Sequence, residues 1–239
     1  VFHTARWRAD VPLQGQRVGV IGTGASAIQV VPAIAPQVGA LTLFQRTPAW
    51  IIPRMDHAVS AATQARYRAS PWRQRLARGL TYARLEWRAL PFTRLPGLLE
   101  LAQRDVLRYL HKQVKDPELR RKLTPGYTMG CKRILLSDDF YPALLRPNVK
   151  LVDQAVVRAT PTGVVTADGA QHALDVLVAA TGFQVADAGA PFEIIGQRGR
   201  SLHDEWANGG QAHLGTVVAG FPNLFVMTGP NTGLGHNSM

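Results

Sequence analysis

The chain has 239 residues, of which 46% are hydrophobic and 18% charged, and a net charge of +11. This length suffices for one large or two small domains with well-packed cores. A single cysteine, Cys131, excludes an internal disulfide framework and a Cys-x-x-Cys redox pair, and with it a disulfide reductase within this sequence. No apolar run is long enough to span a bilayer. We therefore expect a protein of a reducing compartment, the cytoplasm.

Most of the positive charge lies in one segment. Residues 57–123 hold 15 of the 27 basic residues and 5 of the 16 acidic ones. Charges at helical spacing are usually solvated helix faces, so we expect no nucleic-acid partner. A nucleic-acid-binding protein is an alternative that rests on this segment and on the overall charge.

Residues 1–13 mix polar and aromatic side chains, and Pro12 followed by Gly15 indicates a linker into the next element. His3 and Trp7 stand four residues apart in this segment. By itself that spacing indicates no more than a loop with a packed Trp.

Residues 17–27 predict a buried strand, a glycine-rich turn and the start of a helix. Gly22, Gly24 and Ala27 occupy the three small-residue positions of G-x-G-x-x-G/A. The first glycine permits a tight turn, the second lets the backbone approach a pyrophosphate, and the small third residue lets helix and strand pack closely. The positive helix N-terminus then meets the phosphates. The residues predicted to contact the cofactor here are Gly22, Thr23, Gly24, Ala25, Ser26, Ala27 and Gln29.

A helix over residues 25–38 follows, and its apolar face consists of Ile28, Val31, Ile34 and Val38. A second strand over residues 41–44 then leads to Arg46 and Thr47. An NAD site carries Asp or Glu just past this strand to bind the ribose diol, whereas a cation suits a 2′-phosphate. The sequence therefore predicts NADP(H) as the cofactor. The alternative is an exposed strand-end Arg without a ligand.

The next segment, residues 55–125, has helical character. Helices are expected over residues 61–68, 72–90 and 98–114, separated by prolines. In the last of these, Leu99, Val106 and Leu110 form the inner face, while Arg104, Arg108 and Lys112 point away.

After this segment, Lys132 and Arg133 precede a short apolar strand. The run Ser137–Asp138–Asp139 is expected to provide the N-cap of a helix over residues 140–145. Strands over residues 149–152, 163–165 and 175–180 follow. The last of these leads into Thr181 and Gly182.

Several short motifs, in this order along the chain, resemble those of flavin-dependent Baeyer–Villiger monooxygenases. His3 and Trp7 match the end of that family's F-x-G-x-x-x-H-x-x-x-W-P/D fingerprint, with Arg8 where Pro or Asp is usual. The sister family of flavin-containing N/S-monooxygenases more often has Tyr or Phe at the position of Trp7. The other matching motifs are F-Q-R-T-P at 44–48, G-x-K-R at 130–133, A-T-G-F at 180–183 and G-P-N-T at 229–232.

The resemblance implies roles for particular residues. Arg46, Thr47 and Lys132 would bind the 2′-phosphate, and Arg133 would face the flavin as the catalytic cation, because a developing oxyanion needs a cation that cannot deprotonate. The alternative is two solvent-facing cations, or Arg133 paired with Asp138 or Asp139. The segments expected near the cofactors comprise Thr181, Gly182, Gly229, Pro230, Asn231 and Thr232.

The fold implied is α/β: a Rossmann-like NADP-binding domain with a helical insertion and the edges of a truncated FAD-binding Rossmann-like domain. Residues 1–13 would form the edge of the FAD domain and a linker. Residues 14–54 and 126–183 would form the NADP domain, residues 55–125 the insertion, and residues 184–239 an incomplete part of the FAD domain. The FAD pyrophosphate motif, a second G-x-G-x-x-G, does not occur in this sequence. We therefore expect a part of a longer protein, inactive alone.

The activity implied is an FAD- and NADPH-dependent monooxygenase in which a flavin C4a-peroxide inserts oxygen from O2 next to a ketone carbonyl. One alternative is N- or S-oxygenation of an amine or thioether. Another, of a different class, is a non-catalytic NADP(H)-binding module. No metal site is expected.

Overall fold

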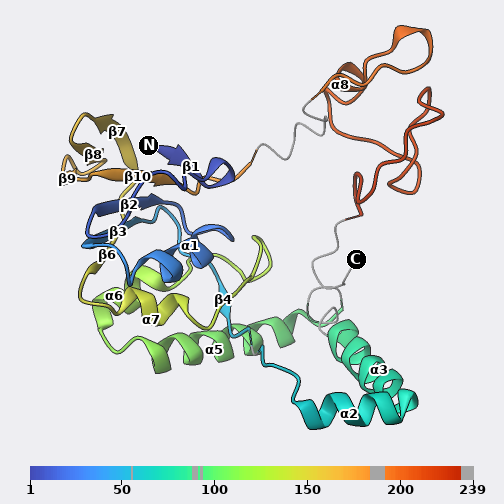
Figure 1. Ribbon diagram of the computed structural model, residues 1–239, viewed down its shortest axis with the longest axis horizontal. Helices are drawn as coiled ribbons and strands as arrows, with labels where there is room; N and C mark the ends of the chain where they lie inside the picture. Colours follow the sequence, from blue (N-terminus) through green and yellow to red (C-terminus); the bar gives the residue numbers. More distant parts are fainter. Residues whose placement is uncertain (55, 88–90, 92–93, 184–191, 233–239) are drawn as a thin grey trace. The chain divides into compact units, whose positions relative to one another are not determined.

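The computed structural model describes residues 1–54, 56–87, 91, 94–183 and 192–232 (Figure 1). The chain divides into two compact units, each of which is described by itself. The first comprises Val1–Arg68 and Pro91–Gly182, and the second comprises Ala69–Leu90 and Phe183–Met239.

A five-stranded parallel sheet forms the centre of the first unit. Its strands lie in the order β1 (Phe2–His3), β10 (Val176–Ala179), β2 (Arg17–Ile21), β3 (Ala40–Phe44) and β6 (Val149–Val152). All four neighbouring pairs are parallel. This arrangement confirms the predicted α/β, Rossmann-like fold class. The edge strand β1 lies in the segment that the sequence indicates as a linker.

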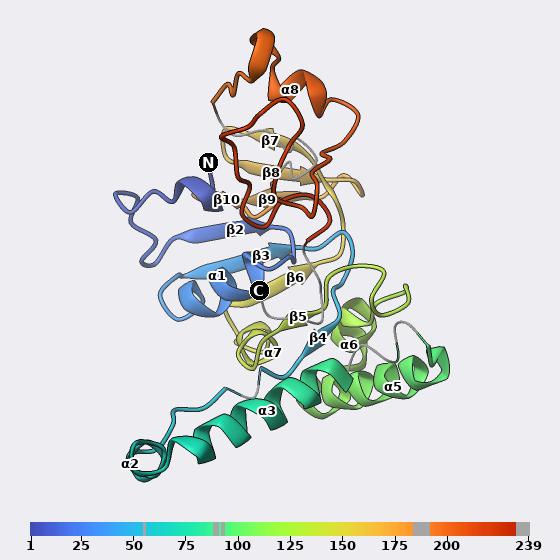
Figure 2. The same ribbon diagram turned by 90° about the vertical axis from the view of Figure 1, so that its right-hand side faces the viewer.

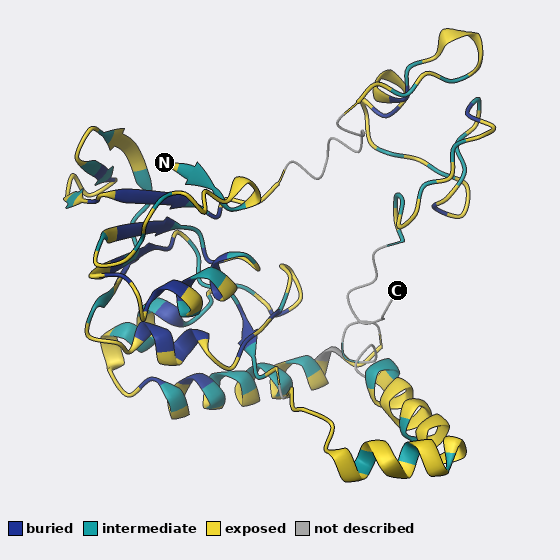
Figure 3. Cartoon of the chain, viewed as in Figure 1, coloured by how far each residue is buried: buried dark blue, intermediate teal, exposed yellow. Residues whose placement is uncertain are grey.

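Successive side chains of the strands point to opposite faces of the sheet and pack in two separate cores. On one face, Val18 and Val20 of β2 are completely buried against α1 (Ala27–Ile34) and α7 (Phe140–Leu144). Figure 3 shows buried residues along the sheet and on the facing sides of these helices. Because successive side chains of a strand point to opposite faces, the residues between them face the other way.

A three-stranded antiparallel sheet covers the other face. It consists of β7 (Val156–Thr160), β8 (Gly163–Thr166) and β9 (Gln171–Ala173). Val164 of β8 packs in one buried cluster with Phe44 of the main sheet. Of these three strands, the sequence patterns predicted only β8.

Helix α1 is shorter than predicted, since it spans Ala27–Ile34 rather than residues 25–38. After Ile34 the helix gives way to turns: Pro36 donates no N–H, and the Gln37 N–H donates to the Ile34 carbonyl, three residues before it, over 2.9 Å. Within those turns the Val38 N–H still donates to the Ile34 carbonyl over 3.2 Å. The predicted apolar face is confirmed, because Ile28, Val31, Ile34 and Val38 are all buried.

Helices also form in the segment predicted to be helical: α2 (Ala61–Ala69), α3 (Pro71–Trp87), α5 (Pro96–Gln113) and α6 (Pro117–Leu123). Residues 88–90, at the end of one predicted helix, lie outside the described part of the chain. In α5, Leu110 is buried, as predicted. Three cations that were predicted to point away are exposed: Arg104, Arg108 and Lys112.

Two very short strands, β4 (Ile51–Ile52) and β5 (Leu135–Leu136), pair in parallel (Figure 2). The sequence predicted the apolar strand before Ser137 but not its partner. Of the three residues predicted to provide the N-cap of the next helix, Ser137 makes a capping hydrogen bond, because its Oγ accepts the Phe140 N–H over 3.1 Å, whereas the side chain of Asp139, which directly precedes the helix, makes none.

The second unit contains α8 (Leu202–Glu205) and a small core of Leu202, Trp206 and Phe221. The Trp206 indole N–H donates to the Gln211 carbonyl over 3.0 Å. Within the described residues of both units, no helix is long and apolar enough to cross a membrane.

Removal of one carboxylate tests what holds β10 to β2. Asp175 accepts the Arg17 backbone N–H over 2.9 Å and two guanidinium N–H groups over 3.0 and 2.6 Å. Hydrogen bonds from the Arg17 side chain lower the pKa of Asp175 to about 2. A lowered carboxylate pKa stabilises the fold above the ordinary pKa and loses this effect as pH falls through the lowered value. We expect Asp175→Asn to lower the Tm at pH 7, and the difference from wild type to shrink between pH 4 and 2.

Thermal unfolding followed by circular dichroism at pH 7, 4, 3 and 2 measures this difference. Glu100→Gln, at an exposed position of α5, is the matched control and should leave the Tm unchanged at every pH. A Tm difference for Asp175→Asn that stays constant from pH 4 to 2 would contradict the assignment.

Candidate functional site

The glycine turn follows β2 at the carboxyl edge of the sheet. Gly22 has φ +108°, and a Cβ there would lie 2.5 Å from the Ala180 carbonyl oxygen. Its N–H donates to the Phe44 carbonyl over 3.0 Å. At Gly24 the opposite holds, because a Cβ would meet no atom within 4 Å. The first glycine therefore serves the fold, while the second leaves open space above the backbone.

The segment after β3 is fixed beside this turn. The Thr23 hydroxyl donates to the Thr47 carbonyl over 3.0 Å. Gln45 is 2% exposed, and its side-chain amide donates to the Lys122 carbonyl over 2.7 Å. The chain on both sides of Arg46 is therefore held by hydrogen bonds to other segments.

A third segment reaches the same place through β4 and β5. The Trp50 carbonyl accepts the Leu135 N–H over 2.8 Å, and the Trp50 indole N–H donates to the Tyr127 carbonyl over 2.8 Å. In the middle of the loop, the Met129 N–H donates to Gln103 Oε1 of α5 over 2.8 Å. These bonds place residues 127–135 next to the segment that follows β3.

The three segments line one cavity of about 260 Å³. Six of the predicted site residues line it: Thr23, Gly24, Ala25, Thr47, Lys132 and Arg133. Four others that sequence analysis did not select also line it: Pro48, Ala49, Tyr127 and Leu135. Pro48 belongs to the F-Q-R-T-P motif and Ala49 follows it, while Tyr127 and Leu135 lie within three residues of the G-x-K-R motif, so nearness to those motifs was the available signal.

The cations at this cavity, Lys132 and Arg133, are exposed. Among the described residues, no ion pair includes Lys132 or Arg133, so the alternative in which Arg133 pairs with Asp138 or Asp139 does not hold there. Instead, Lys132 Nζ lies 4.8 Å from the centroid of the Tyr127 ring. Burial raises the pKa of the Tyr127 phenol, so the ring is uncharged at neutral pH.

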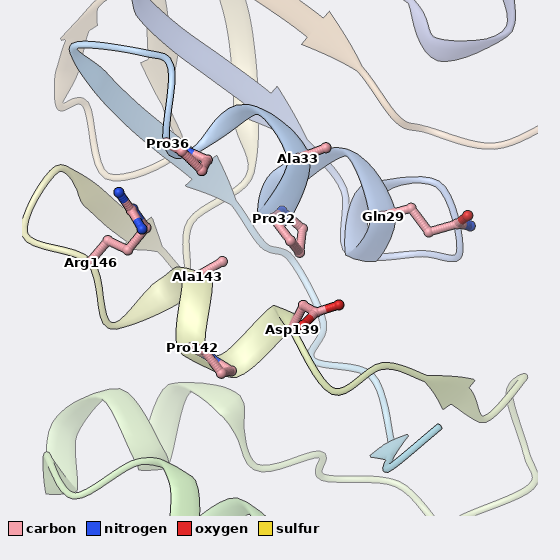
Figure 4. A pocket seen from close by; sticks show the side chains of 8 residues that line it. All are labelled: Gln29, Pro32, Ala33, Pro36, Asp139, Pro142, Ala143 and Arg146. Carbon is pink, nitrogen blue, oxygen red and sulfur yellow. The ribbon is translucent and has the colours of Figure 1, made fainter. Parts of the chain in front are cut away.

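Other residues predicted for the same site lie near it without lining it. Arg46 is exposed and directly precedes Thr47. Ser26 and the completely buried Ala27 lie at the start of α1. Gln29 lies along a different groove, between α1 and α7 (Figure 4), and its amide donates to the Ala25 carbonyl over 2.7 Å.

The remaining predicted residues lie in two other places. His3 is opposite Ala179 in the pairing of β1 with β10, two residues before Thr181. Trp7 is 42% exposed and packs edge-on against Phe2, with centroids 5.1 Å apart. Gly182, with φ +91°, ends the first unit.

The G-P-N-T motif belongs to the second unit. The Thr232 hydroxyl donates to the Gly229 carbonyl over 2.7 Å, and Asn231 has φ +62°. These residues therefore form a local turn, with Pro230 inside it, and their predicted role toward FAD stays a prediction.

Comparison with known proteins shows which proteins the chain resembles. No family model matches the chain. Two proteins named Baeyer-Villiger monooxygenase match all of it, one from Pseudomonas aeruginosa at 50% identity and one from Streptomyces coelicolor at 48%. Over its whole length, the chain is therefore similar to proteins of this name. It spans less than half the length of these two relatives, 45% and 46%.

Several solved structures share the fold. An oxidized steroid monooxygenase bound to NADP is 36% identical, with a TM-score of 0.77 over 95% of this chain and 51% of its own. A cyclohexanone-bound cyclohexanone monooxygenase is 31% identical, with a TM-score of 0.79 over 96% and 52%. OTEMO in complex with FAD and NADP is 30% identical, with a TM-score of 0.79 over 97% and 51%.

Alanine at each of the two glycines should separate folding from binding. Gly22→Ala places a Cβ against a carbonyl at a positive φ, so we expect it to lower the free energy of unfolding by about 2 kcal/mol. Gly24→Ala points into open space, so we expect a change within about 0.5 kcal/mol. The same methyl group should nevertheless weaken NADP⁺ binding, because it occupies the space that a pyrophosphate would approach. Urea unfolding and calorimetric titration measure the two effects.

Equal losses of stability in both variants would show that Gly24 also serves the fold. Unchanged NADP⁺ affinity of Gly24→Ala would place the pyrophosphate elsewhere.

Proposed function

We propose that the chain forms the NADP(H)-binding part of an FAD- and NADPH-dependent monooxygenase of the Baeyer–Villiger type. The observation that supports this most is the convergence of three segments, at residues 23–25, 47–49 and 127–135, on one cavity. Two cations without carboxylate partners among the described residues line it beside a turn that leads into a helix N-terminus. Such a site suits a polyanion, since both the backbone N–H groups and the cations bind phosphate.

The residues present fit NADP(H) better than NAD(H). The open space at Gly24 suits a pyrophosphate, because no side chain keeps a ligand away from that backbone. Thr47 and Lys132 at the cavity, with Arg46 beside it, are the groups that would bind a 2′-phosphate. The segment just past β3, where an NAD site has a carboxylate that binds the ribose diol, has Arg46 instead.

Arg133 is proposed as the catalytic cation. When bound, NADPH would supply the reducing equivalents and FAD the group that reacts with O2. Arg133 lines the cavity and carries a cationic guanidinium, so it would stabilise negative charge that develops on oxygen. For FAD the support comes from the relatives, since OTEMO was solved with both FAD and NADP.

A ketone is the proposed substrate class. One structural neighbour, cyclohexanone monooxygenase, was solved with cyclohexanone bound. NADPH consumption with a panel of ketones and thioethers tests this in the complete enzyme. Turnover of thioethers alone would contradict the Baeyer–Villiger assignment.

Loss of either phosphate-binding cation should reduce binding of NADP⁺ but not of NAD⁺. A hydrogen bond to a charged group contributes about 1.5–3 kcal/mol, and exposure of these cations favours the lower end, so we expect about a tenfold increase in the Kd for NADP⁺. The variants are Arg46→Ala and Lys132→Ala, measured by calorimetric titration of the chain with each nucleotide.

The control is Lys112→Ala, which removes an exposed cation from α5 outside the cavity. It should change neither Kd. If wild type binds the two nucleotides equally, or if the site variants weaken both to the same extent, the proposed 2′-phosphate site is wrong.

A further inference from the structure

Tyr127 stands between the nucleotide cavity and the fold that supports it. Its side chain lines the cavity. Its carbonyl accepts the indole N–H of Trp50 over 2.8 Å, and Trp50 is 4% exposed. The Lys132 Nζ lies over its ring, 4.8 Å from the ring centroid. A contact path therefore runs from a buried residue, through Tyr127, to a cation at the cavity.

The loop that contains Tyr127 and Lys132 is fixed at both ends by one residue. Trp50 accepts the Leu135 N–H through its carbonyl and donates to the Tyr127 carbonyl through its indole. Trp50 also follows Thr47 by three positions. The backbone of Tyr127 is thus held in place by Trp50, which directly follows the neighbouring cavity segment, through a bond that does not involve the Tyr127 side chain.

Lys132 alone would be poorly positioned. Its ammonium sits on a flexible four-carbon stem, is exposed, and has no carboxylate partner among the described residues. Fixing such a side chain on binding costs conformational entropy, which lowers affinity. A ring face within about 6 Å attracts the ammonium without neutralising it. The charge therefore stays available to a phosphate while its position is restricted.

We propose that Tyr127 is a positioning residue for recognition of the 2′-phosphate, because its ring holds the Lys132 ammonium at the cavity before the nucleotide binds. This inference rests on the proposed function, in which Lys132 binds that phosphate. Tyr127 thereby contributes to the preference for NADP(H) over NAD(H) without touching the phosphate.

Three substitutions test the ring. Tyr127→Phe keeps the ring face, whereas Tyr127→Leu and Tyr127→Met remove it; all three keep the backbone carbonyl that Trp50 binds. We expect Tyr127→Phe to retain the wild-type Kd for NADP⁺ and the other two to raise it about two- to fivefold, the effect of losing an exposed cation–π contact. The Kd for NAD⁺ should stay unchanged in all three. In a Lys132→Ala background, none of the three should change either Kd further.

A second measurement does not depend on nucleotide. In the free chain labelled with 13C at the lysine ε carbon, the Lys132 signal should show an upfield ring-current shift in wild type and Tyr127→Phe. The shift should be lost in Tyr127→Leu and Tyr127→Met, with the signal assigned by its absence in Lys132→Ala. Thermal unfolding of each variant verifies that it folds.

The outcomes separate this inference from the proposed function. Equal NADP⁺ affinity of all Tyr127 variants, or a missing ring-current shift in wild type, would overturn the positioning role alone. An equal loss of NADP⁺ and NAD⁺ binding, or a loss that persists without Lys132, would show that the ring contacts the nucleotide itself and would also overturn it. If wild type shows the ring-current shift but does not prefer NADP⁺, the proposed function fails.

Discussion

Two parallel strands that end at the same edge of one sheet determine where two of the segments that line the cavity lie. Because β2 and β3 pair in register up to Ile21 and Phe44, the turn after one and the loop after the other start side by side. The Gly22 N–H and the Thr23 hydroxyl continue this pairing beyond the strands. Strand order also reverses at β2, with β3 and β6 on one side and β10 and β1 on the other. The crevice at such a point is the usual ligand site of open α/β sheets.

Lys122 and Arg17 of the first unit differ from Lys132 in the kind of group that they contact. Lys122 lies 3.5 Å from Asp153, and Arg17 forms a bidentate pair with Asp175, so both are bound to carboxylates within the fold. At the cavity, Lys132 contacts a neutral ring instead. A cation already paired with a carboxylate would have to give up that pair to bind a phosphate. Because a ring attracts the ammonium but carries no charge, it positions the cation while the charge remains unsatisfied.

Sequence patterns predicted the elements whose signals are local. The strand, glycine turn and apolar helix face from Arg17 to Val38 follow from residue types at fixed spacing, and the structure has them. The pairing of β4 with β5 could not be predicted, since two-residue strands carry no periodicity. The cation–π contact between Tyr127 and Lys132 depends on loop geometry that no spacing rule describes. Conversely, the roles of Lys132 and Arg133 came from resemblance, and the structure adds that both line the cavity with Thr47.

Two of the helices between β4 and β5, α5 and α6, contribute to the site although none of their described residues lines the cavity. Two buried or half-buried amides connect them to it. Gln45 donates to the carbonyl of Lys122 at the end of α6, which fixes the chain just before Arg46. Gln103 of α5 accepts the Met129 N–H, which fixes the loop just before Lys132. Because a buried amide left without its partner costs about 1–3 kcal/mol, each contact resists displacement of its loop. The predicted 2′-phosphate residues Thr47 and Lys132 are far apart in sequence, and α5 and α6 hold the two segments that bring them together.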